Sequence, residues 1–105
     1  MLTVVIPAYN AQDYIDRAVT SVRGFDGVEV LIVDDGSRDK TAQIADEWVA
    51  RDPEHIRVIH QENAGHGGAV NAGIASARGR YLKILDADYW LDRLALKRAL
   101  ERLAL

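Results

Sequence analysis

This chain contains four short apolar segments, and a helix-like pattern of apolar residues follows each of them. The first two segments are nearly continuous runs of β-branched residues and leucine, as is typical of strands covered on both faces. Parallel neighbours need a crossover between them, so strict alternation predicts a parallel sheet. We therefore expect an α/β fold, a Rossmann-like parallel sheet of about four strands with helices on both faces. The expected strands are 2–7, 28–33, 56–60 and 80–85, and the helices contain 15–22, span about 40–51 and 68–77, and begin near 91.

Length and composition limit what such a chain can do. Its 105 residues suffice for one core and leave no room for a second. A net charge of −3 argues against a basic nucleic-acid binder, and the absence of cysteine excludes a disulfide scaffold or a thiolate metal site. The N-terminus does not resemble a signal peptide, and no apolar run approaches the ~20 residues of a membrane span. We expect a cytoplasmic protein, and association with the inner face of the membrane stays open.

The last expected helix is strongly apolar and runs to Leu105 without a cap, a glycine or a charged tail. Two explanations compete. Either the sequence ends at a natural boundary between two halves of a larger protein, which we favour, or this helix packs on a partner, for example in a homodimer. At the other end of the fold, Asn10 is a candidate N-cap for the first helix, with Asp13 three positions further on.

Acidic side chains follow two of the four strands. Asp34 and Asp35 come after the second strand, and Asp86 and Asp88 come after the fourth. Ligands of open α/β sheets bind outside the carboxyl ends of the strands, so we expect the four acids to converge there. Their mutual repulsion is relieved by a divalent cation, and oxygen ligands suit Mg²⁺ or Mn²⁺ bridged to phosphates. Alternatively, Asp34 and Asp35 begin a turn with 36–37, and Asp86 caps the last helix.

Other residues near the strand ends allow two interpretations each. The glycine-rich stretch 65–68 could present backbone N–H groups to an anion, or it could be a close-packed helix start. Asn71 and Gly73 could support that loop or let the helix pack closely on the sheet. Tyr9 could stack on a base or cover the edge of the core. His60 and His66 lack the spacing of a metal motif, so we expect each to be solvated or hydrogen-bonded.

Taken together, four motifs closely resemble the family 2 glycosyltransferases of the GT-A fold. They occur in the expected order and at the expected separations, and they cover about residues 2–92. The resemblance implies that the chain is the N-terminal, nucleotide-sugar-binding half of such a fold. The motifs are Val5-Ile6-Pro7-Ala8-Tyr9-Asn10, Val33-Asp34-Asp35-Gly36-Ser37-Arg38-Asp39-Lys40-Thr41, Asn63-Ala64-Gly65-His66-Gly67-Gly68-Ala69-Val70-Asn71-Ala72-Gly73 and Leu85-Asp86-Ala87-Asp88.

The same resemblance implies roles for individual residues toward a nucleotide-sugar donor, usually a UDP-sugar. The 7–9 segment lies beside the uridine, and Asp35 accepts a hydrogen bond from the ring N–H of uracil. Asp86 lies near the ribose and the metal-bound diphosphate, and Asp88 is the direct ligand of Mn²⁺ or Mg²⁺. The expected nucleotide-sugar-binding residues are Pro7, Ala8, Tyr9, Asn10, Asp35, Gly68, Asn71, Asp86 and Ala87, and the expected metal ligands are Asp88 and Asp86.

The implied activity is an inverting, metal-dependent transfer of the sugar to a hydroxyl acceptor. The metal would neutralise the charge that develops on the leaving UDP, and a general base would activate the acceptor. In this family the base belongs to the C-terminal, acceptor-binding half, so no catalytic base is assigned here. We expect residues 1–105 to form a single nucleotide-sugar-binding domain, truncated before that half and inactive alone. Val70 replaces a common arginine and Tyr89 a common acidic or small polar residue, which leaves the donor open.

Three other functions compete with this interpretation. A nucleotidyltransferase shares the half-fold but needs a glycine-rich loop after the first strand, where this chain has Pro7-Ala8-Tyr9. A receiver-like signalling domain would place paired acids after the first strand and an aspartate after the third, where this chain has Gln61-Glu62. A nucleotide-binding or assembly module that keeps the fold without transferase activity stays open.

Overall fold

The computed structural model describes residues 1–103 and has the expected α/β architecture. Four parallel strands form one sheet in the order β3-β2-β1-β4, and the elements alternate along the chain without exception. No helix of this part of the chain is both long and apolar enough to cross a membrane. The elements are β1 (Leu2–Ala8), α1 (Ile15–Val22), β2 (Val28–Asp35), α2 (Thr41–Arg51), β3 (Ile56–Gln61), α3 (Gly65–Ser76), β4 (Tyr81–Ile84) and α4 (Arg93–Leu103).

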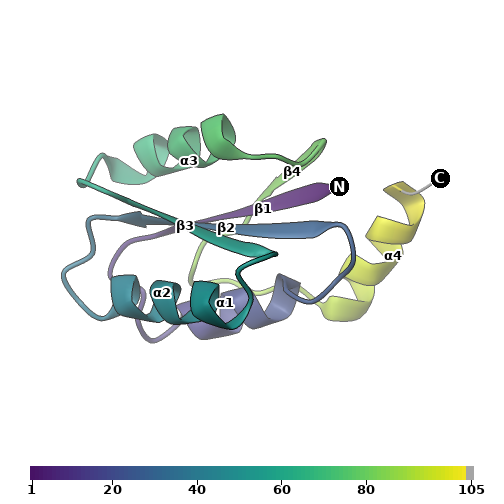
Figure 1. The fold of residues 1–105 in the computed structure, drawn as a ribbon, viewed down its shortest axis with the longest axis horizontal. Helices are drawn as coiled ribbons and strands as arrows, with labels where there is room; N and C mark the ends of the chain where they lie inside the picture. Colours follow the sequence, from purple (N-terminus) through teal and green to yellow (C-terminus); the bar gives the residue numbers. More distant parts are fainter. Residues whose placement is uncertain (104–105) are drawn as a thin grey trace.

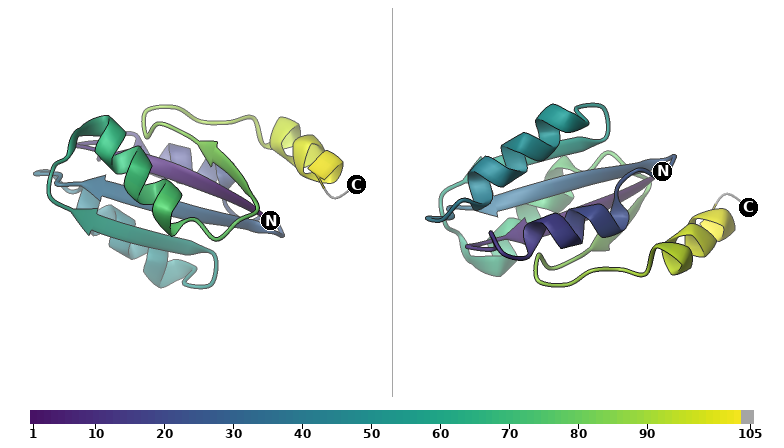
Figure 2. Two further views of the ribbon diagram at one scale, coloured as in Figure 1. Left: turned by 90° about the horizontal axis from the view of Figure 1, so that it is seen from above. Right: turned by 90° about the horizontal axis from the view of Figure 1, so that it is seen from below.

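Helices cover both faces of the sheet, as the sequence predicts. Figure 1 shows α1 and α2 on one face and α3 on the other, with the strands between them. Every residue of β1 and β2 is buried, because these two strands lie in the centre of the sheet. Figure 2 shows α4 set apart from the sheet, near the end that holds the N-terminus.

The order of the strands creates a switch point between β1 and β4. The helices that connect β1 to β2 and β2 to β3 lie on one face, whereas α3, which connects β3 to β4, crosses the other face. Successive strands therefore run outward on one side of β1, and the chain then returns to its other side. Open α/β sheets bind ligands at such a point, outside the carboxyl ends of the strands.

The helix α3 packs unusually close to the sheet through a glycine. A Cβ atom at Gly73 would collide with the side chain of Val5 on the central strand β1. Val5, Leu31, Val33 and Ala69 form the buried cluster on this face. Of the two interpretations of Gly73, the structure therefore supports close packing of the helix on the sheet.

Helix starts differ most from the sequence predictions. The helix α3 begins at Gly65, three residues earlier than expected, so the glycine-rich stretch forms its first turn. Asn10 does not cap α1, which follows Tyr14 without a side-chain cap; instead Asn10 adopts a left-handed conformation with φ of 50°. Asp92 rather than Asp86 begins α4, because its Oδ1 accepts the N–H groups of residues 94 and 95 at 2.8 and 3.1 Å.

The apolar residues of α4 do not form a single exposed face. Leu96 is buried and Leu100 packs against the main core, whereas Leu94 and Leu103 are exposed by 57% and 41%. Leu105, to which the prediction of an apolar terminal helix extends, lies outside the described residues. The helix thus anchors on the domain and leaves two leucines accessible.

A buried polar network lies at the amino end of the sheet. The Glu29 carboxylate, 4% exposed, accepts hydrogen bonds from Thr3 Oγ1 at 2.8 Å, Arg57 Nε at 2.6 Å and the Arg78 backbone N–H at 3.2 Å. Arg57 also donates to the Ser76 carbonyl at 2.6 Å. These bonds tie the C-terminal end of α3 to three strands, and they leave the Glu29 charge fully paired.

Candidate functional site

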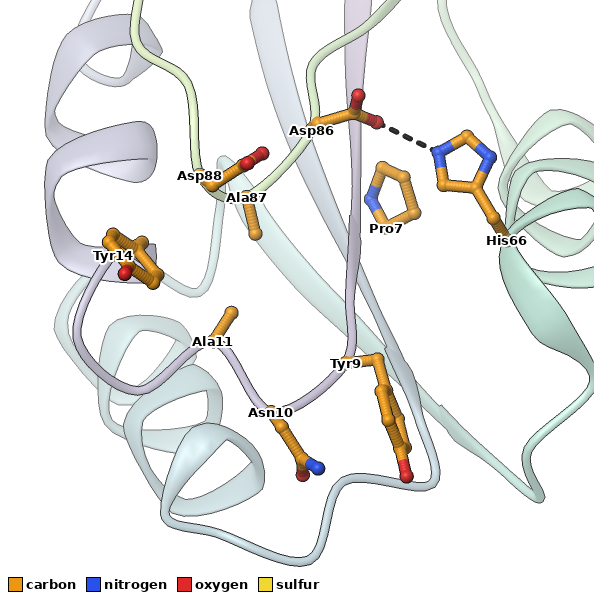
Figure 3. A pocket seen from close by; sticks show the side chains of 9 residues that line it. All are labelled: Pro7, Tyr9, Asn10, Ala11, Tyr14, His66, Asp86, Ala87 and Asp88. Atoms are coloured by element: carbon orange, nitrogen blue, oxygen red, sulfur yellow. Dashed lines mark hydrogen bonds and ion pairs between the residues drawn. The ribbon is translucent and has the colours of Figure 1, made fainter.

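Two adjoining pockets open at the carboxyl ends of the strands, on either side of the loop that follows β1. They have volumes of about 390 and 210 Å³ and share Pro7, Tyr9 and His66. Figure 3 shows the larger one, whose walls come from the 9–14 loop, the start of α3 and the 86–88 loop. Its other lining residues are Asn10, Ala11, Tyr14, Asp86, Ala87 and Asp88, and those of the smaller pocket are Ala8, Asp35, Asn63, Gly65 and Ala69.

Hydrogen bonds hold the loop after β1 in place. Asn10 donates its backbone N–H to Ser37 Oγ at 3.0 Å, and its side-chain oxygen accepts the N–H of Arg38 at 2.8 Å. The backbone N–H of Ala11 donates to Thr41 Oγ1 at 2.8 Å. The polar residues after the paired aspartates therefore build one wall of the site by fixing the neighbouring loop. Sequence reasoning quoted these residues within a motif but did not assign them this task.

Asp35 lies at the base of the smaller pocket and is 3% exposed. Its Oδ1 accepts hydrogen bonds from Gln61 Nε2 at 2.9 Å and from the backbone N–H of Ala64 at 2.8 Å. Burial alone would raise its pKa, but these bonds and one from the Gly65 N–H outweigh burial and lower the pKa. Asp35 is thus an ionised acceptor at neutral pH, and it anchors the start of α3, a role that the sequence prediction missed.

Asp86 and Asp88 flank the buried Ala87 on the wall of the larger pocket. The Asp86 Oδ1 atom lies 2.8 Å from Nε2 of His66, which reaches across from the first turn of α3 (Figure 3). Asp88 is exposed. Across residues 1–103, no three histidine or carboxylate side chains converge as a ready-made metal site. These two carboxylates could therefore supply only part of a coordination shell.

Arg17 positions the segment that carries Asp88, and sequence reasoning missed it. Its guanidinium lies 3.7 Å from the centre of the Trp90 ring, and its Nη2 atom donates to the Asp88 carbonyl at 3.4 Å. One turn later on α1, Ser21 Oγ accepts the N–H of Leu91 at 3.1 Å. The only sequence signal was the placement of both polar residues on α1 at a spacing of four, which puts them on one face.

Asp34 does not join the other acids, contrary to the expected convergence of all four. Adjacent residues of a strand point to opposite faces, so Asp35 lies on the α3 side and Asp34 on the α2 side. Asp34 accepts the Ser37 backbone N–H at 3.1 Å, as its interpretation as a turn residue predicts, and it contacts His60 at 2.8 Å. The candidate site therefore holds three of the four acids.

The remaining expected residues divide into two groups. Pro7, Ala8 and Tyr9 line the pockets, and Tyr9 is 49% exposed, so its ring is a wall of the site and not a cover of the core. Gly68 and Asn71 lie further along α3 and are not among the described residues that line either pocket. A binding role for these two stays a prediction.

A larger hollow of about 480 Å³ lies between β4 and α4, away from the carboxyl ends of the strands. Its lining is mainly apolar and includes Leu2, Leu82, Leu96 and Leu103. Asp35, Asp86, Asp88 and the glycine-rich turn are absent from this lining, so the candidate site is the pair of smaller pockets.

Comparison with known proteins shows the family of this chain. Residues 3–104 match the sequence model of the family described as glycosyl transferase family 2. The chain belongs to this family. The resemblance seen in the four motifs is thereby confirmed. Over 103 residues the chain is 41% identical to the succinoglycan biosynthesis protein ExoO of Rhizobium meliloti, a match that covers 96% of the chain and 29% of ExoO.

Solved glycosyltransferase structures share the fold of this family 2 chain. Residues 1–349 of TarS of S. aureus, in complex with UDP-GlcNAc, superimpose with a TM-score of 0.85 at 28% identity, over 98% of the chain and 31% of that solved chain. The mannosyltransferase PcManGT of Pyrobaculum calidifontis, in complex with GDP-Man and Mn²⁺, gives a TM-score of 0.83 at 29% identity, over 99% of the chain and 32% of PcManGT. The chain thus spans about a third of each of these solved chains, and the expected α/β fold of GT-A glycosyltransferases is confirmed.

Proposed function

We propose that this chain is the donor-binding domain of a metal-dependent, inverting glycosyltransferase that transfers a sugar from a UDP-sugar to a hydroxyl acceptor. The observation that carries the proposal is the joining of two pockets at the switch point of the sheet. One pocket contains the buried carboxylate Asp35, and the other contains the accessible pair Asp86 and Asp88. A nucleotide with a charged diphosphate needs both kinds of surface, one for its base and one for its phosphates.

The smaller pocket is the proposed place of the nucleobase. Pro7, Ala8 and Tyr9 give it an apolar wall, and the lowered pKa of Asp35 keeps an acceptor available for a ring N–H of the base. The complex of TarS with UDP-GlcNAc supports uracil. The complex of PcManGT with GDP-Man supports guanine as the alternative base, whose ring N–H would face the same carboxylate.

The larger pocket is the proposed place of the diphosphate and of Mn²⁺ or Mg²⁺. Hard divalent cations are often held by one or two carboxylates, with phosphate and water oxygens completing the shell, which fits the two accessible acids Asp86 and Asp88. When bound, the cation would supply a Lewis acid that stabilises negative charge on the departing nucleotide. Asp88 would be the direct ligand, Asp86 would also face the ribose, and Asn10 and Ala87 would line the donor. The Mn²⁺ complex of PcManGT supports this assignment.

The general base and the acceptor site are proposed to lie outside this sequence. The chain spans about a third of the relatives described above, so a domain of this length would bind the donor without turning it over. A cytoplasmic location and contact with the inner face of the membrane remain predictions from the sequence.

A homodimer through α4 is supported by the exposed Leu94 and Leu103. Light scattering that shows only monomer at high concentration would contradict the dimer.

Thermal unfolding with a panel of nucleotides tests the proposal. UDP, GDP, ADP and CMP are each added with and without Mn²⁺, and a ligand at a hundredfold excess over its Kd adds about 2.7 kcal/mol of stability. We expect stabilisation by UDP that depends on Mn²⁺. If GDP stabilises the chain and UDP does not, guanine replaces uracil as the proposed nucleobase, and the proposed site stays the same. No stabilisation by any nucleotide would contradict the proposal, whereas binding without transfer in a longer chain would favour a binding module.

A further inference from the structure

His60, at the end of β3, lies between two carboxylates that come from different elements. Its Nδ1 atom is 2.8 Å from Asp34 Oδ2 on β2, and its Nε2 atom is 2.7 Å from Asp46 Oδ1 on α2. An ionised carboxylate only accepts hydrogen bonds, so each ring nitrogen must carry a proton to satisfy its partner. The geometry therefore fits the doubly protonated, positively charged ring.

Hydrogen bonds run without interruption from His60 to the wall of the larger pocket. Asp34 uses its second oxygen, Oδ1, to accept the backbone N–H of Ser37 at 3.1 Å. The Ser37 hydroxyl accepts the backbone N–H of Asn10 at 3.0 Å, and Asn10 lines the pocket. Asp34 is 4% exposed and directly precedes Asp35 of the smaller pocket. His60 is thus connected to Asn10 of the larger pocket through one buried carboxylate and the Ser37 residue.

We propose that His60 is a positioning residue for the nucleotide pockets, and that loss of its positive charge at higher pH weakens nucleotide binding. His60 does not touch the proposed nucleotide. It acts by fixing Asp34, which holds the 36–38 turn and, through that turn, the loop after β1. The identity of the ligand rests on the function proposed above, whereas the control of the turn by His60 does not.

The direction of the pH effect follows from the groups that face the ring. Asp34 from β2 and Asp46 from α2 are the charged groups that act on it from the elements packed against it. Their hydrogen bonds and charges raise the pKa of His60 above its usual value of 6.5, and partial burial opposes them. A raised pKa means that the bridge is complete below 6.5 and is lost as the pH rises through the higher, folded-state pKa.

A matched pair of histidine variants tests the role of the ring. His55 also contacts an aspartate, Asp52 at 2.9 Å, but it lies at the opposite end of β3, beyond the pockets. Calorimetric titration of UDP with Mg²⁺ is performed on wild type, His60→Ala and His55→Ala at about pH 6 and about pH 8.5. The UDP affinities of variant and wild type are compared at the same pH, so the titration of UDP itself affects both and cancels in their ratio.

We expect His60→Ala to weaken UDP binding about fivefold at the lower pH and less than about twofold at the higher pH. His55→Ala should match wild type at both. An equal loss at both pH values would overturn the proposal, because it would indicate a structural role that does not depend on charge. The same loss in His55→Ala would also overturn it.

Asp46→Asn gives a second, independent test. It removes one carboxylate from the ring and leaves the Asp34 contact in place, so His60 should lose its proton at a lower pH. NMR titration of the His60 ring and of the Ser37 amide should show one common midpoint in wild type, shifted down by about one unit in the variant. If the Ser37 amide does not follow the ring, the positioning role is overturned.

The NMR titration also separates this inference from the proposed function. If wild type binds UDP at neither pH, the proposed function fails, and the Ser37 amide still decides whether His60 controls the turn. If UDP binds and the Ser37 amide does not titrate with the His60 ring, only the positioning role fails.

Discussion

The two ends of the central sheet carry similar charged residues but use them in opposite ways. At the amino end, the buried Glu29 carboxylate accepts three hydrogen bonds, one of them from the guanidinium of Arg57. At the carboxyl end, the Asp86 carboxylate contacts the exposed His66, and Asp88 is exposed on the wall of a pocket. The first arrangement has its charges paired within the protein, whereas the second leaves carboxylate oxygens available to a ligand.

The helix α3 connects these two ends. Its last turn is tied to the Glu29 network through the Ser76 carbonyl, and its first turn is held by Asp35. The network at one end therefore helps to fix the glycine-rich turn at the other. At the carboxyl end, Asp34 and Asp35 are bonded within the protein, and only Asp86 and Asp88 keep accessible oxygens.

The largest expected effect comes from removing Glu29 from the buried network at the amino end of the sheet. Glu29→Ala leaves the Arg57 guanidinium, the Thr3 hydroxyl and a backbone N–H without their acceptor. We therefore expect the free energy of unfolding, measured in urea, to fall by about 3 kcal/mol. Glu47→Ala, on the exposed side of α2, is the control and should change stability by less than about 0.5 kcal/mol. A loss below about 1 kcal/mol for Glu29→Ala would show that the network does not stabilise the fold.

The next effect concerns the packing of α3 on the sheet. Gly73→Ala places a methyl group against Val5, and we expect a loss of about 2 kcal/mol in urea unfolding from overpacking. Gly67→Ala is a matched control in the same helix, because nothing lies within 4 Å of its added Cβ. Helix propensity predicts a gain of about 0.5 to 1 kcal/mol there. Equal effects of the two substitutions would contradict the close approach.

The accessible acids Asp86 and Asp88 should respond in binding and not in stability. Asp88→Asn removes the proposed metal ligand, so the Mn²⁺-dependent increase in UDP affinity should fall by about tenfold or more, with unfolding unchanged. Asp13→Asn removes the same charge from an exposed position before α1 and should leave the increase intact. Undiminished enhancement by Mn²⁺ in Asp88→Asn, measured by calorimetry, would remove Asp88 from the metal site.

The smallest effect is a pH dependence of stability through Asp35. Hydrogen bonds lower its pKa in the folded state, so its contribution is present above the usual value of 3.8 and is lost as the pH falls through the lower, folded-state pKa. Asp35→Asn should therefore destabilise the protein by about 1 kcal/mol more at neutral pH than in strong acid. For Asp13→Asn the difference from wild type should not change with pH. A constant difference for Asp35→Asn as well would mean that its carboxylate is not specifically stabilised.

The fold, and the sheet edge at which the candidate pockets open, could be predicted from the sequence for identifiable reasons. The apolar runs of β1 and β2 are unambiguous because both strands are buried on both faces. Asp35, Asp86 and Asp88 could be placed because strand ends meet at one edge of a parallel sheet. Asp34 was misplaced because alternation along the strand, which separates it from Asp35, was not applied to the last residues of β2.

Side-chain contacts between distant segments could not be predicted in the same way. The bonds from Ser37 to Asn10, from His60 to Asp34 and from Arg17 to the segment after β4 join residues 26 to 71 positions apart. No local pattern reports such pairs, since each partner alone resembles an ordinary solvated polar residue. The start of α3 was also missed, because glycines are poor helix formers and here the helix is held by the Asp35 carboxylate.

The most direct test of this division between the two ends is an NMR titration of the ¹⁵N-labelled chain with UDP and Mg²⁺. We expect amide shifts to change at Tyr9, in the 35–38 turn, at the start of α3 and in the 86–88 loop, while the amides around Glu29 and Arg57 stay constant. Changes centred on the Glu29 network or on the apolar hollow between β4 and α4, with none at the strand ends, would contradict it.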